Sequence, residues 1–148
     1  MTELINKEDF ETLREMLNND ENALKLCIDL LFVGHLWDDL IDQDQDRAKE
    51  EINKAFYLTL NNFDNNPFYC ALRSELQPLI TSACLMWLDS TSLEKKDKLT
   101  AFIIRQGLAQ IIHYCIYRLG GYEWVREHGP KLWELFKLPD KYQEFIKE

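Results

Sequence analysis

Glycine and proline are scarce in this sequence, with five and four copies among 148 residues. No Asn-Gly or Asp-Gly pair occurs, so the commonest signals for a two-residue β-hairpin are missing. Long stretches instead repeat apolar residues at helical spacing, and the 46% hydrophobic fraction is typical of a globular chain. We therefore predict one all-α domain over residues 1–148, folded as a compact helical bundle.

Basic residues are also in deficit, since 17 Lys and Arg face 26 Asp and Glu and give a net charge of −9. This charge disfavours nonspecific binding to nucleic acid or to an anionic membrane surface. The best apolar run is interrupted by Lys25, Asp29 and His35, so we predict no membrane span.

The four cysteines, Cys27, Cys70, Cys84 and Cys115, are far apart and form no CxxC or Cys/His pair with zinc spacing. Each lies in an apolar run, and no secretory signal precedes them. We predict buried, reduced thiols in a cytoplasmic protein.

Helical periodicity and turn residues divide the chain into successive helices. Asn18 and Asn19 end the first helix, Asp20 caps the second, and Pro78 should kink the fourth. The predicted helices cover 7–17, 20–42, 47–62, 67–88 and 92–121, followed by short helices bracketed by 129–130 and 139.

The end of the second predicted helix carries an unusual concentration of acids. At about 100° per residue, Asp38 and Asp42 lie about 40° apart, on one face with His35. Asp39 lies about 60° further round the helix. Earlier positions on the same face are apolar: Leu24, Cys27 and Leu31. The carboxylates therefore continue a stripe that is directed at the core.

Carboxylates that face a core are costly unless a cation or hydrogen-bond donors neutralise them. Oxygen ligands of this kind suit Mg²⁺ or Mn²⁺, especially where a phosphate supplies further oxygens. Asp38, Asp39 and Asp42 are therefore candidate metal ligands. The alternative is that the helix frays near Leu40 and the acids form a solvated corner.

The segment 38–47, DDLIDQDQDR, resembles the first aspartate-rich motif, DDxxDxxxxRRG, of the trans-isoprenyl diphosphate synthases in the isoprenoid (terpenoid) synthase superfamily. The resemblance implies an all-α bundle around a central cavity. It implies that Asp38, Asp39 and Asp42 bind Mg²⁺ and that Arg47 contacts the diphosphate of a prenyl ligand. The second arginine and the glycine of the motif are replaced by Ala48 and Lys49, and a second aspartate-rich motif is missing. A prenyl transferase or diphosphate lyase activity is thus left open.

A second polar stripe follows in the fifth predicted helix. Between 99 and 117 the only formal charge is Arg105. The stripe is neutral and spans about 60° of the helical wheel: Gln106, Gln110, His113 and Tyr117. It favours the wall of a polar, substrate-binding cavity or a subunit interface. The alternative is that these side chains satisfy one another or face solvent.

His35 and His113 are candidate general acids or bases, although a lone histidine on a helix is more often a hydrogen-bonded structural residue. Three arginines are candidates to neutralise acids or bind phosphate: Arg73, Arg105 and Arg118.

We therefore expect a small isoprenoid-synthase-like protein that binds a diphosphate ligand through Mg²⁺, as a homodimer. The contrasting hypothesis is a non-catalytic helical interaction protein, such as an accessory protein of a virus or a bacterium, which acts through a dimer or partner interface.

Overall fold

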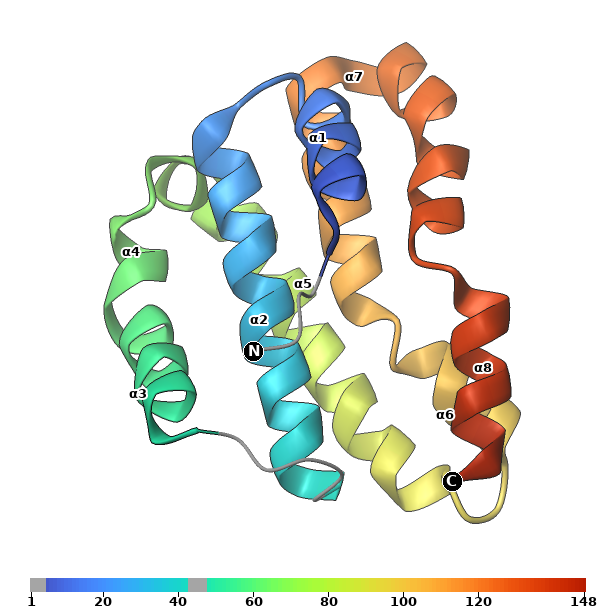
Figure 1. Ribbon diagram of the computed structural model, residues 1–148. Coiled ribbons are helices and arrows are strands. Elements are labelled where there is room, and N and C mark those ends of the chain that lie inside the picture. Colours follow the sequence, from blue (N-terminus) through green and yellow to red (C-terminus); the bar gives the residue numbers. More distant parts are fainter. Residues whose placement is uncertain (1–4, 43–47) are drawn as a thin grey trace.

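The computed structural model describes residues 5–42 and 48–148, and within them every regular element is a helix. The all-α prediction is confirmed. In chain order the elements are α1 (Lys7–Met16), α2 (Glu21–Asp42), α3 (Lys49–Tyr57), the π-helix η1 (Leu58–Asn62), α4 (Phe63–Asn65), α5 (Pro67–Leu93), α6 (Lys98–Ile104), α7 (Gly107–Leu135) and α8 (Leu138–Lys147). Figure 1 shows α2 in the middle of the bundle, with α3 and α4 on one side and α1, α7 and α8 on the other.

The predicted boundary between the first two helices is confirmed by its backbone geometry. Asn18 and Asn19 adopt left-handed φ values of 54° and 58°, which asparagine tolerates better than most residues. The Oδ1 atom of Asp20 accepts a hydrogen bond from the backbone N–H of Ala23 at 2.9 Å, as an N-cap does. These local signals turn the chain sharply and set α2 against α1.

The kink of the fourth predicted helix and the start of the fifth lie at other residues than predicted. The kink in α5 is at Leu72, where φ is −114° and ψ is 17°, and not at Pro78. The single helix predicted over 92–121 is wrong at its start and in its continuity. It begins at Lys98 as α6, where Asp97 accepts a hydrogen bond from the backbone N–H of Thr100 at 3.0 Å, and it is interrupted after Ile104, before α7 begins at Gly107.

The expected helix end at Gly120 and Gly121 is a reversal within α7. Gly121 has φ 84° and ψ −171°, a conformation that residues with a Cβ rarely adopt. The reversal brings the ring of His113 within 5.9 Å of the ring of Trp133, which in a straight helix would be about 30 Å away. The predicted break at Gly129 and Pro130 is wrong, since the second arm of α7 runs through them.

Two clusters of buried side chains hold the bundle together. The main cluster joins α1, α2, α5 and α7, and its fully buried members include Leu13, Met16, Leu26, Leu76, Ile112, Ile116 and Leu132. The second cluster joins α2 to α3 and η1: Phe32, Leu36, Ala55 and Leu58. α2 contributes to both, which explains its central place.

The cysteines occupy different environments. Cys27 and Cys115 are fully buried in the main cluster, whereas Cys84 is half-buried and Cys70 is exposed. All four are free thiols. The prediction of buried thiols therefore holds for two of them and is wrong for Cys70.

One helical run within the described residues, Lys98–Lys147, is long and apolar enough to cross a membrane by composition, with a mean hydropathy of 1.2 in its best window. This run contains α7, whose residues Ile112 and Ile116 belong to the main core cluster. A core helix meets the same criterion, so the run is weak evidence for a membrane span.

Candidate functional site

The predicted core-directed face of α2 is buried only as far as Leu31. Leu24, Cys27 and Leu31 are buried, but His35, one turn later, is exposed. Asp38 and Asp39 are half-buried. Asp42 is the last residue of α2, and its side chain and the whole of Arg47 lie outside the described residues.

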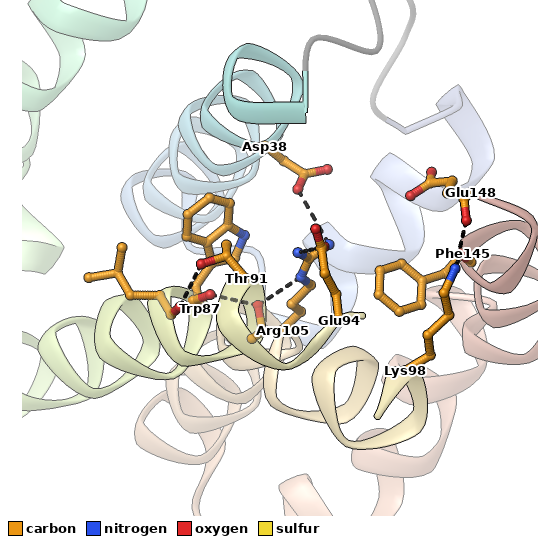
Figure 2. A network of polar contacts seen from close by, with 10 residues as sticks. Asp38, Trp87, Thr91, Glu94, Lys98, Arg105, Phe145 and Glu148 are labelled. Carbon is orange, nitrogen blue, oxygen red and sulfur yellow. Dashed lines mark hydrogen bonds and ion pairs between the residues drawn. The ribbon is translucent and has the colours of Figure 1, made fainter. Parts of the chain in front are cut away.

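Arg105 is the side chain that the structure brings to the acidic end of α2. Its Nη1 atom lies 3.9 Å from Oδ1 of Asp38, and its Nη2 atom donates a hydrogen bond to Oε2 of Glu94 at 2.6 Å. Its Nε atom donates to the hydroxyl of Ser90 at 2.7 Å. In Figure 2 the carboxylates of Asp38 and Glu94 approach the guanidinium from α2 and from the end of α5.

This guanidinium is largely removed from water, since the side chain of Arg105 is only 10% exposed. Its central carbon lies 5.8 Å from the ring of Trp87 and 5.0 Å from the ring of Phe145, at the range of cation–π attraction. Trp87 in turn stacks on Trp37 of α2 at 4.3 Å. Aromatic side chains from three helices thus shield these charges from water, which strengthens the attraction between the guanidinium and the carboxylates.

The local structure explains how Arg105 reaches this position. Arg105 follows the last residue of α6, where the chain leaves the helix before α7 begins. Ser90 is fully buried, and its hydroxyl also donates to the carbonyl of Trp87 at 2.6 Å, which fixes the oxygen that receives Arg105. At the other end of the same region, Nζ of Lys98 lies 2.7 Å from a backbone oxygen of Glu148 and ties α6 to the end of α8 (Figure 2).

Sequence reasoning found part of this network. It named Arg105 as a candidate to neutralise acids, and the structure pairs Arg105 with two carboxylates. It missed Ser90 and Glu94, because the segment 89–94 fits no metal motif and carries no other spacing signal. The other two candidates also pair with acids: Arg118 lies 2.9 Å from Glu75 and Arg73 lies 3.6 Å from Asp64.

In the described part of the chain, no three His, Cys, Asp or Glu side chains lie close enough together to hold a metal ion between them. Asp38 and Asp39 lie at the end of α2, and the carboxylate of Glu94, which pairs with Arg105, comes from the end of α5. Mg²⁺ commonly binds to one or two carboxylates together with phosphate oxygens of a ligand.

The neutral stripe on α7 does not form one wall. Gln110 and Tyr117 are exposed, whereas Gln106 is half-buried and donates from Nε2 to the carbonyl of Phe102 at 2.9 Å. His113 is half-buried against Trp133, and a Cβ on Gly129 would lie only 3.0 Å from its Nε2 atom. This close packing is typical of a structural histidine.

The two candidate histidines lie in different places. His35 lines a pocket beside α8, and His113 is not among the residues that line it. The pocket that His35 lines contains no residue of the network around Arg105 among its described wall residues, which are Ile5, Asn6, Asp9, Leu31, His35, Leu135, Phe136, Lys137 and Lys141.

No protein-family model, curated protein or solved structure matches this chain.

Proposed function

We propose that this helical domain binds a diphosphate-containing ligand through Mg²⁺ or Mn²⁺ at the C-terminal end of α2. The observation that supports it is the convergence of Asp38 and Glu94 on the guanidinium of Arg105, at 3.9 Å and 2.6 Å. Carboxylates from two helices and an arginine between them are the groups that a metal-bound diphosphate needs.

The spacing within the network leaves Nη1 of Arg105 suited to a phosphate oxygen. At 3.9 Å, its contact with Asp38 is too long for a hydrogen bond, and no described residue accepts one from Nη1 at a shorter distance. Ser90 and Glu94 fix the rest of the guanidinium, so Nη1 is held in place. Guanidinium groups bind phosphate oxygens strongly and with defined geometry.

Asp38 and Asp39 are the proposed metal ligands, with Asp42 completing the aspartate-rich motif. The ion would neutralise the carboxylates and bridge them to the diphosphate. Arg47, next along the motif, is the proposed second contact to the ligand. The proposal is for ligand binding in an isoprenoid-synthase-like bundle, and turnover of a prenyl diphosphate is a separate question for assay.

The test is a thermal melt with millimolar Mg²⁺, with inorganic pyrophosphate, and with both together. A ligand that binds only the folded state raises its stability by about 2.7 kcal/mol at 100 times its dissociation constant. We expect a shift that needs both components, that Asp38→Asn abolishes, and that Glu123→Gln, an exposed acid on the second arm of α7, leaves intact. Equal shifts in both variants, or none in the native protein, would falsify the proposal.

A second candidate function is that of a helical interaction protein that forms a homodimer. The exposed apolar residues on α3 and η1 favour it, because Phe56, Tyr57 and Leu60 are 63%, 59% and 77% exposed. Neighbouring large apolar residues at such exposure often mark a protein interface. The exposed Gln110 and Tyr117 also suit an interface better than a cavity wall. Such a protein would have no need of a metal.

Sedimentation of the native protein and of Leu60→Ser tests this second function. If a dimer forms through α3 and η1, Leu60→Ser should dissociate at a higher protein concentration than the control Thr59→Ser. The control removes only one methyl group from the neighbouring exposed residue. A native protein that is monomeric at all concentrations would contradict the homodimer.

A cytoplasmic location is likewise a proposal, consistent with the free thiols of the described cysteines.

A further inference from the structure

A pocket of about 340 Å³ lies between the start of α1, the second half of α2 and the junction of α7 with α8. Leu31 and Phe136 contribute apolar walls, and Asp9, His35, Lys137 and Lys141 contribute polar ones. Pockets that bind small molecules usually have this character, with an apolar lining and a few polar groups that fix orientation. Its volume is at the lower end of their range.

The pocket wall carries more basic than acidic side chains, whereas the whole chain is acidic. The protein carries a net charge of −9, yet two lysines and a histidine face this pocket with a single carboxylate, that of Asp9. Within residues 5–42 and 48–148, no carboxylate lies within ion-pairing distance of Lys137 or Lys141. The two ammonium groups therefore have no described counter-charge in contact.

Both lysines come from the junction of α7 with α8 and line the pocket with exposed side chains. Lys137 has a left-handed φ of 51° where the chain turns from α7 into α8, and it is the N-cap residue of α8. Lys141 lies one turn later, and its Nζ atom is 5.3 Å from the ring centroid of Phe136. Partial burial lowers the pKa of Lys141, and the charge of Lys137 lowers it further, although Glu144 acts in the opposite direction. An anion in the pocket would relieve this repulsion.

We propose that this pocket binds a small organic oxyanion with a short apolar tail, its head group on Lys137 and Lys141 and its tail against Leu31 and Phe136. The site requires no divalent cation and is separate from the network around Arg105, whose residues do not line it. The inference therefore goes beyond the proposed diphosphate function and stands without it.

The test is titration with hexyl phosphate in the presence of EDTA, measured by calorimetry and by the change in melting temperature. We expect saturable binding that weakens about tenfold in Lys137→Gln and in Lys141→Gln, since each removes one charge-assisted contact. The matched control is Lys147→Gln, which removes an exposed lysine from the other end of α8 and should bind as the native protein does.

Three probes separate the contributions of head group and tail. Hexanoate should bind at the same site, because either head group is an oxyanion. Hexan-1-ol should not bind, since it lacks the charge, and inorganic phosphate should bind more weakly, since it lacks the tail. Equal affinity of hexyl phosphate for Lys141→Gln and Lys147→Gln overturns the proposal. Binding of hexan-1-ol with the affinity of hexyl phosphate does so as well. So does the absence of hexyl phosphate binding to the native protein at millimolar concentration.

Discussion

The Nη2 atom of Arg105 lies 2.6 Å from the Oε2 atom of Glu94. Glu94 is the C-cap residue of α5 and Arg105 is the C-cap residue of α6, so this ion pair joins the ends of two successive helices. The burial of Arg105 and of its other partner, Ser90, makes the contact structural whether or not the nearby acids bind a ligand.

Replacement of Arg105 by glutamine should therefore destabilise the fold. The change leaves the hydroxyl of Ser90 and the carboxylate of Glu94 without their donor, at an expected cost of about 1–3 kcal/mol. Urea unfolding followed by circular dichroism measures the loss. Arg126→Gln is the control, because Arg126 is exposed and contacts only the ring of Tyr122 at 5.9 Å among its described interactions. Equal stability of the two variants would contradict a structural role for Arg105.

Replacement of Gly107 by alanine should also destabilise the protein, by overpacking. A Cβ at this position would lie 2.5 Å from Cβ of Ala83 and 2.9 Å from its Cα, and the Cα belongs to backbone that has little room to move. The expected cost is about 1–3 kcal/mol. A double-mutant cycle identifies the cause, because Ala83→Gly should recover part of the loss in Gly107→Ala.

The same cycle distinguishes overpacking from backbone strain. Gly121→Ala should be destabilising although its Cβ would meet nothing within 4 Å, because its φ is 84°. Ala83→Gly should give no recovery in that background. Recovery in both backgrounds would mean that Ala83 acts independently of Gly107.

The cap of α6 predicts a dependence of stability on pH. Hydrogen bonds from the hydroxyl and the backbone N–H of Thr100 lower the pKa of Asp97. A carboxyl group whose pKa is lower in the folded state stabilises the fold above its unfolded pKa, and loses this effect as the pH falls through the folded value. Asp97→Asn keeps a capping oxygen but does not titrate. The difference in unfolding free energy between this variant and the native protein should therefore narrow below about pH 4. A constant difference over that range would show that the charge does not contribute.

The thiols should react in a fixed order with iodoacetamide. Cys70 is exposed and should be modified in the folded protein. Burial raises the pKa of Cys84, which should react more slowly. Contact with Cys115 raises the pKa of Cys27 well above its usual range, and burial raises it further, so both should react only after unfolding. Mass spectrometry of native and urea-treated samples checks this order. Modification of Cys27 at the rate of Cys70 would contradict the buried pair.

The sequence predicted the helices best where their ends depend on neighbouring residues. Asp20 caps α2 through a residue three positions away, and Asn18 and Asn19 adopt a conformation that their side chains tolerate. The kink expected at Pro78 was wrong, because the backbone departs from helical geometry at Leu72, whose sequence carries no signal for it. α5 ends at Leu93, later than the predicted Leu88, and the next helix begins at Lys98 with Asp97 as its cap.

The site was predictable only in its separate parts. The acids of α2 and the charge of Arg105 stand out in the sequence, but nothing in the spacing brings Glu94 to them. That proximity depends on the turn between α5 and α6 and on the break that follows Ile104. The sequence predicts the neutral stripe of α7 as one face, but the second arm of α7 covers His113 with Trp133 and leaves Gln110 exposed.

The division of the buried side chains into two clusters has a consequence for amide hydrogen exchange. α3 and η1 are held to the bundle mainly through Phe32 and Leu36 of α2, a far smaller contact than the one joining α1, α2, α5 and α7. Regions with few buried apolar contacts open at lower free energy than the global core. The amides of α3 should therefore exchange through a local opening that leaves the protection of α7 unchanged, so that the domain behaves as two cooperative units of unequal stability.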